Sequence, residues 1–137
     1  MTTLVVCIDR AGDLVAGTDP PVVGRAAVES LVVDVGVEDP EDSQVNCLLE
    51  ALRVARDLDD GGDETVVAAL AGTDDTVGAD RAIARQVERL IDDHDPDSAV
   101  VVVDSAEDER LVPIVESRLT VDAVDRVVVR QARDIES

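Results

Sequence analysis

Four short aliphatic runs restrict this chain to few folds. They are Leu4–Ile8, Thr65–Ala71, Ala99–Val103 and Val124–Val129; they are rich in valine, and the last also contains Asp125 and Arg126. Runs of this length are typical of strands that are buried on both faces, as in a parallel sheet. The chain contains no Phe, Tyr or Trp, so Val, Leu, Ile and Ala must build the core.

Helical patterns separate these runs. We expect a first helix from about Gly24 that is capped at Gly36, and a second with Asp39 as N-cap and Pro40 in its first turn. A third helix is expected over 78–91, and Pro113 predicts a break in the fourth near residues 110–112. The alternation predicts a single α/β domain over residues 1–137, a three-layer α/β/α sandwich. Its sheet would have four parallel strands in the order 2-1-3-4, as in Rossmann-like or flavodoxin-like folds.

The charge of the chain excludes some partners. Its formal net charge is -20, and all twelve basic residues are arginine. Nucleic-acid binding needs a basic surface, and single strands also need aromatic stacking platforms, so we expect no nucleic-acid partner. At about 1 M salt the Debye length falls to about 3 Å, which makes such a surface tolerable. The composition resembles that of proteins from salt-loving archaea with a salty cytoplasm.

No apolar run approaches the length of about 18 residues that a membrane span needs, and no signal peptide precedes the first strand. We therefore expect a soluble, cytoplasmic domain. Cys7 and Cys47 lack metal-ligand spacing and are interpreted as buried thiols. His94 is expected in a solvated polar loop.

Ligands of parallel α/β sheets bind outside the carboxyl ends of the strands. The candidate ligand-binding residues are therefore those that end or follow a strand: Asp9, Arg10, Asp13, Gly72, Thr73, Asp104, Ser105, Arg130 and Gln131.

Carboxylates at two strand ends suit Mg²⁺ that keeps several waters and meets a phosphate. Asp9, Asp104 and Glu107 are the candidate metal ligands, and Arg10 and Arg130 would hold the phosphate.

A structural interpretation competes with this one. Ser105 and Asp108 form a capping box, and acidic residues in a first helical turn complement the helix dipole. Asp9 and Arg10 could simply pair with neighbours across their loop. Both interpretations stay open at this point.

Sharper catalytic motifs are absent. The glycines match neither a P-loop nor the GxGxxG dinucleotide fingerprint, and there is no GxSxG. Neither cysteine has a histidine at a suitable place, which argues against a nucleophilic hydrolase.

Several segments together resemble an archaeal family known as domain of unknown function 373. They are CIDRAGDL, PVVGRAAVESL, DPEDSQVNCLLEALR, VGADRAIARQVERL, SAEDERLVPIVESRL and VDRVVVRQARDIES. The resemblance covers nearly the whole chain and implies that members continue from this soluble domain into transmembrane helices. Recurring charged and polar positions of the family fall here on Asp9, Arg10, Asp13, Asp42, Asn46, Asp80, Arg81, Glu107, Asp108, Glu109, Arg130 and Gln131. Ala11 and Gly12 depart from the family, which is often more acidic there.

Three functions are consistent with these observations. The first is a cytoplasmic sensing or interaction domain that binds a small anionic or metal-bridged ligand and has its own transmembrane region as a partner. The alternative is a Mg²⁺-dependent phosphoryl-transfer or phosphodiester-cleaving enzyme. The third is a homodimerising domain. An interaction role predicts an exposed apolar patch, which we place on Ile114, Val115 and Leu119.

Overall fold

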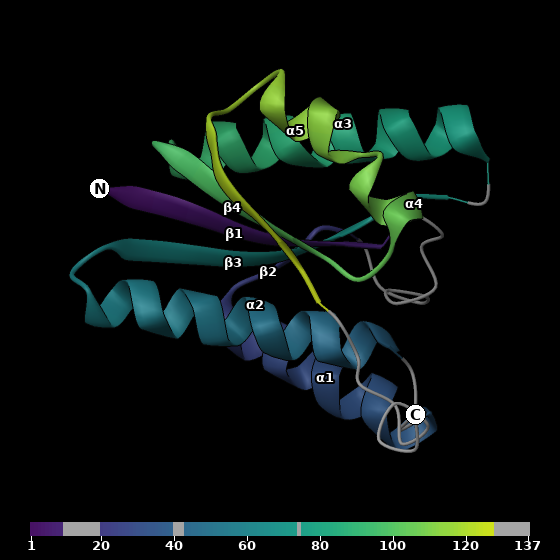
Figure 1. The fold of residues 1–137 in the computed structure, drawn as a ribbon, viewed down its shortest axis with the longest axis horizontal. Helices are drawn as coiled ribbons and strands as arrows, with labels where there is room; N and C mark the ends of the chain where they lie inside the picture. Colours follow the sequence, from purple (N-terminus) through teal and green to yellow (C-terminus); the bar gives the residue numbers. More distant parts are fainter. Residues whose placement is uncertain (10–19, 40–42, 74, 128–137) are drawn as a thin grey trace, which may run out of the picture.

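The structure is a computed structural model and describes residues 1–9, 20–39, 43–73 and 75–127 (Figure 1). Strands and helices alternate along most of the chain, as the aliphatic runs predict. The prediction of an α/β fold is therefore confirmed.

One five-stranded sheet forms the centre of the molecule, in the order β2-β3-β1-β4-β5. The strands are β1 (Thr2–Asp9), β2 (Val22–Val23), β3 (Glu64–Ala71), β4 (Ser98–Val103) and β5 (Val121–Arg126). β1, β3, β4 and β5 run parallel, whereas β2 pairs with β3 in the antiparallel direction. The expected sheet of four parallel strands is thus corrected to a mixed sheet of five.

Helices lie on both sides of this sheet (Figure 1). They are α1 (Arg25–Glu38), α2 (Ser43–Asp60), α3 (Thr76–His94), α4 (Ala106–Glu109) and α5 (Val112–Glu116). One core cluster joins the sheet to α1 and α2, with Val5 and Leu48 at its centre. A second joins it to α3 and α5 through residues such as Ile8, Ile83 and Val115. Residues 4–8 of β1 contribute alternately to the two clusters, which explains why this run has apolar side chains on both faces.

Several predicted boundaries are wrong. Helix α1 continues through Gly36 to Glu38, and the N–H of Asp39 caps it by donating to the Val35 carbonyl. Asp39 is therefore the C-cap of α1. The described part of α2 is Ser43–Asp60, and Pro40 lies outside the described residues. His94 is the last residue of α3 and is exposed there.

The last strand is Val121–Arg126, three residues earlier than expected. At the edge of the sheet its side chains are mostly exposed, so polar residues such as Asp122 and Asp125 belong to the strand. The later valines drew the prediction toward the C-terminus. The break at Pro113 is confirmed, because α4 ends at Glu109 and α5 begins at Val112.

Candidate functional site

The carboxyl ends of β1, β3 and β4 lie side by side, because the three strands are parallel neighbours. Asp9 ends β1 and is only 4% exposed. Its backbone carbonyl accepts a hydrogen bond of 2.7 Å from the N–H of Gly72, which follows β3. Half-buried Asp104 follows β4 directly. The predicted site residues at these strand ends therefore share one edge of the sheet.

Two cysteines lie near this edge, in β1 and in the helix α2. Cys7 of β1 and Cys47 of α2 are both fully buried and reduced, which confirms the prediction of buried thiols. The pKa of Cys7 is raised well above its usual value, first by a hydrogen bond with Cys47 and then by burial. The negative charges of Asp9 and Asp104 raise it further. Both carboxylates therefore lie near one buried thiol, which stays protonated and unreactive.

Asp104 is held from the side of α2. The side-chain amide of Gln44, in the first turn of α2, donates a hydrogen bond of 3.3 Å to its Oδ1. The Cys47 thiol donates at 3.5 Å to the Val102 carbonyl, two residues before Asp104. The start of α2 is thus fastened to the carboxyl end of β4.

The DSAEDER segment forms a helix cap, as its pattern predicts. Ser105 is the N-cap of α4, and its hydroxyl accepts a hydrogen bond of 3.2 Å from the Asp108 N–H. The same hydroxyl donates at 3.0 Å to the carboxylate of Asp108, which is 5% exposed. Glu107 is exposed. The cap accounts for Ser105 and Asp108 without any ligand.

No three His, Cys, Asp or Glu side chains in the described part of the chain gather closely enough to hold a metal ion. Asp9, Asp104 and Glu107 therefore do not form a three-ligand set. A Mg²⁺ ion held by two carboxylates and water needs fewer protein ligands, and that arrangement stays a prediction.

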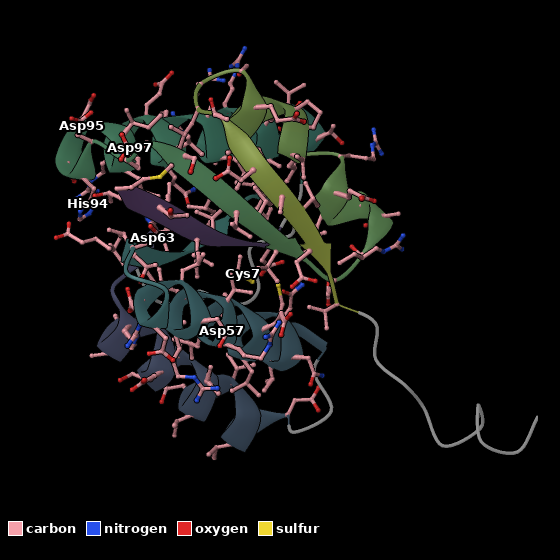
Figure 2. The ribbon with its side chains drawn as sticks, turned by 60° about the vertical axis from the view of Figure 1, so that its left-hand side comes forward. Cys7, Asp57, Asp63, His94, Asp95 and Asp97 are labelled. Atoms are coloured by element: carbon pink, nitrogen blue, oxygen red, sulfur yellow. The ribbon has the colours of Figure 1, made fainter. Side chains whose placement is uncertain are left out.

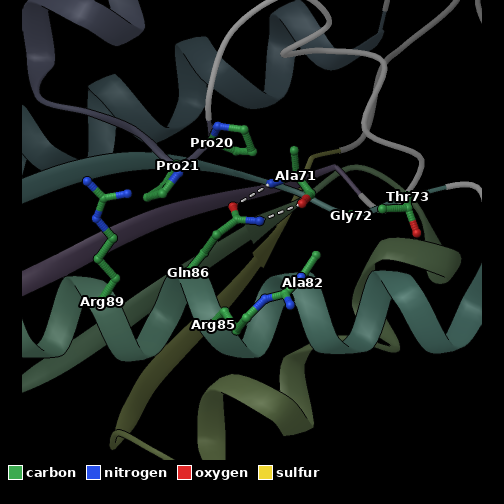
Figure 3. Close-up of a pocket in the computed structure, with 9 residues that line it drawn as sticks. All are labelled: Pro20, Pro21, Ala71, Gly72, Thr73, Ala82, Arg85, Gln86 and Arg89. Carbon is green, nitrogen blue, oxygen red and sulfur yellow. Dashed lines mark hydrogen bonds between the residues drawn. The ribbon is translucent and has the colours of Figure 1, made fainter.

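A pocket of about 290 Å³ opens beside the end of β3 (Figure 3). Its lining residues are Pro20, Pro21, Ala71, Gly72, Thr73, Ala82, Arg85, Gln86 and Arg89. Gln86 is 7% exposed, and its amide both accepts from the Ala71 N–H at 2.9 Å and donates to the Ala71 carbonyl at 2.7 Å. This double hydrogen bond fixes α3 against the strand end and forms the inner wall of the pocket.

Two arginines of α3 give the pocket its charge. Arg85 and Arg89 lie one helical turn apart on the same face, and both are exposed. Arg89 Nε lies 3.9 Å from the Asp93 carboxylate, a loose contact. None of the nine lining residues is acidic.

Sequence reasoning found only part of this pocket. Gly72 and Thr73 were predicted from their place after β3, whereas Arg85, Gln86 and Arg89 were missed. The sequence holds one weak indication of these residues. Arg85 and Arg89 are four residues apart, which places them on one face of the helix that follows the strand. Arg10, Asp13, Arg130 and Gln131 lie outside the described residues.

The predicted apolar patch is wrong. Val115 is fully buried, and Ile114 and Leu119 pack against the core cluster of α3 and α5. In the described residues, the aliphatic side chains with large exposure include Val33 and Val37 of α1 and Leu49 of α2.

Comparison with known proteins gives a family but no activity. The profile of a domain of unknown function, DUF373, matches residues 2–137. An uncharacterized protein of Archaeoglobus fulgidus is 44% identical over 98% of this chain and 40% of its own length. An uncharacterized protein of Methanocaldococcus jannaschii is 31% identical over 98% of this chain and 37% of its own length.

The chain thus spans about two fifths of the length of these curated relatives. No solved structure matches it. None of the described helices is both long enough and apolar enough to cross a membrane.

Proposed function

This chain belongs to the DUF373 family, a domain of unknown function, and from its geometry we propose that it binds a small anion in the pocket beside the end of β3. The observation that carries the proposal is a pocket that has two arginines and no carboxylate among the described residues that line it, in a chain with a net charge of -20. With 32 acidic side chains on 137 residues, a pocket whose charged residues in the described lining are all arginines is not the expected result of surface composition.

The lining defines the class of anion. Guanidinium groups bind phosphate and carboxylate oxygens in a bidentate manner, and Arg85 and Arg89 supply two of them. The absence of aromatic residues leaves a nucleobase without a stacking surface. A volume of about 290 Å³ suits a phosphate ester or a short dicarboxylate.

Calorimetric titration in high salt tests the proposal, because salt screens the repulsion between a dianion and the acidic surface. The probes are inorganic phosphate, pyrophosphate and malonate. We expect Arg85→Gln and Arg89→Gln each to weaken binding about tenfold or more, the loss of one charge-assisted hydrogen bond. Arg110→Gln, an exposed arginine outside the pocket, is the control and should bind like the parent.

If both pocket variants bind the anion as tightly as the parent protein, the anion-binding site lies outside this pocket. If none of the three probes binds the parent protein, the anion-binding proposal is wrong.

The Mg²⁺-dependent phosphoryl-transfer enzyme is the second candidate, and one observation favours it. Asp9 ends β1 and Asp104 follows β4, its parallel neighbour, and the charges of both raise the pKa of Cys7. A titration with Mg²⁺ and Mn²⁺ on the parent, Asp9→Asn and Asp104→Asn separates the two candidates. Metal binding that either substitution abolishes supports the enzyme. A binding heat that is measured with the anions and not with the metal ions supports the anion-binding proposal.

The domain would act as the cytoplasmic sensing or interaction part of a longer protein, with its own transmembrane region as a partner. The length of the curated relatives supports a longer context, because this chain spans about two fifths of them. A three-layer arrangement of the Rossmann-like or flavodoxin-like kind is its framework, with the ligand at the carboxyl edge as in such folds. A dense acidic surface fits a salty cytoplasm.

A further inference from the structure

Helix α1 has an unusual outer face. Its buried side carries Val28 and Leu31, and helical spacing places four other residues on the opposite side: Ala26, Ser30, Val33 and Val37. All four are exposed, Val33 at 62% and Val37 at 80%. The solvent face of a surface helix is normally charged, and 32% of this chain is charged. The outer stripe of α1 nevertheless carries no charge.

Helix α2 continues this surface. The two helices pack side by side on one side of the sheet (Figure 2). Leu49 of α2 is 48% exposed and lines a groove of about 320 Å³ with Arg25, Glu29, Leu52, Arg53 and Arg56. We call the outer stripe of α1 and this groove the α1–α2 face. It carries both projecting valines and a hollow with leucines in its lining.

The charges of this face are self-complementary. The acidic residues Glu29 and Asp34 flank the outer stripe of α1. Arg53 and Arg56 line the groove from α2, and Glu29 lines it from α1, whereas Asp34 lies outside it. Arg53 already pairs with Glu50 and Asp57, whereas Arg56 makes no ion pair among the residues that the structure describes. A two-fold axis that lays α1 of one copy over the groove of another would bring opposite charges together at two equivalent places.

We propose that two copies of this chain associate through the α1–α2 face, with Val33 and Val37 of each copy entering the groove of the other. Glu29 and Asp34 approach Arg56 of the partner copy in this arrangement. The rest of the acidic surface repels a second copy, so the apolar stripe with its arginine-lined groove is where self-association is favourable. This surface is separate from the anion pocket and does not depend on it.

Sedimentation equilibrium in molar KCl measures the association constant of the chain. The parent protein is expected to dimerise, and the double variant Val33→Asp, Val37→Asp to associate at least about tenfold more weakly. Val77→Asp on α3 is the control, because Val77 is also well exposed, at 56%, but lies away from the face. Circular dichroism checks that all three proteins fold.

An exchange of charges tests which residues of the two copies meet in the dimer. Asp34→Arg and Arg56→Glu should each weaken the dimer, and the two together should restore most of the parent association constant, because Asp34 lies outside the groove that Arg56 lines. A parent protein that stays monomeric at millimolar concentration overturns the proposal. So does a Val77→Asp variant that dissociates as completely as the double valine variant.

Discussion

At the scale of single residues, local patterns could be predicted and tertiary ones could not. The Ser105–Asp108 cap depends on two residues that are three apart in the chain, so it could be predicted from the local sequence alone. Arg85 and Arg89 become pocket residues only because α3 packs beside Pro20, Pro21 and the end of β3. The predicted ligand-binding residues all ended or followed a strand, and Arg85 and Arg89 do not.

Another residue-scale feature that no local pattern predicts is the contact between α2 and β5. The hydrogen bond that the protonated Asp125 carboxyl group donates to the Glu50 carboxylate, followed by partial burial, raises the pKa of Asp125 to about 6. The Arg53 hydrogen bond, with that of Asp125, lowers the pKa of Glu50 to about 2. The two carboxyl groups therefore share one proton below about pH 6.

This sharing predicts a pH effect. Because the folded-state pKa of Asp125 lies above its unfolded value near 3.8, the folded state binds more protons, and its stability falls as the pH rises from about 4 through 6. Asp125→Asn keeps a donor for Glu50 and removes this loss. We expect it to unfold at a higher temperature than the parent at pH 7 and at a similar temperature at pH 4.

Thermal unfolding followed by circular dichroism at several pH values is the measurement. Asp92→Asn, an exposed residue of α3, controls for the general benefit of removing one negative charge. If both substitutions give the same pH profile, the shared proton is not what stabilises the contact.

At the scale of elements, the predictions were right about which elements exist and less accurate about where they end. Strong aliphatic runs and helical spacing located the four main strands and the long helices. β2 was missed because two residues carry no periodicity. Gly36 was taken as a helix end because glycine favours caps, but α1 continues through it for two residues.

The position of Gly36 gives a stability prediction. Its φ is not positive, and an added Cβ would meet no atom within 4 Å. Gly36→Ala should therefore stabilise the protein by about 0.5–1 kcal/mol, since glycine loses more backbone entropy in a helix than alanine does. Urea unfolding measures the difference.

Gly62→Ala is the opposite case, because Gly62 has a φ of +101° after α2. Alanine is strained there, so this substitution should destabilise the protein. Equal effects of the two alanines would contradict the assignment of Gly36 to a helix interior.

At the scale of the whole molecule, the prediction of parallel strands succeeded because it depends on composition and not on contacts. A strand such as β4, with all six residues buried, needs apolar side chains on both faces. The antiparallel β2 at the edge depends on where residues 20–24 return to the sheet, which no run of residues encodes.

The net charge of -20 predicts how salt acts on the molecule. Repulsion between carboxylates opposes the compact state, and the Debye length falls from about 10 Å at 0.1 M salt to about 3 Å at 1 M. We expect the unfolding temperature to rise steeply over this range in KCl, and equally in choline chloride. Scanning calorimetry measures it. An increase in KCl alone would instead indicate specific binding of potassium.

The outer edge of β3 has most of its backbone groups covered by a short strand and by side chains. β2 covers it at Ala68 and Ala69, and the Gln86 amide occupies the N–H and carbonyl of Ala71. Near its start, the Asp59 carboxylate accepts hydrogen bonds from the Thr65 hydroxyl, at 2.8 Å, and from the Thr65 N–H. Two side chains thus act as substitutes for a neighbouring strand. A foreign strand finds few open partners along this edge, whereas β5, at the opposite end of the sheet, is a six-residue outer strand. Growth of the sheet into fibrils would therefore begin more readily at β5 than beside β3.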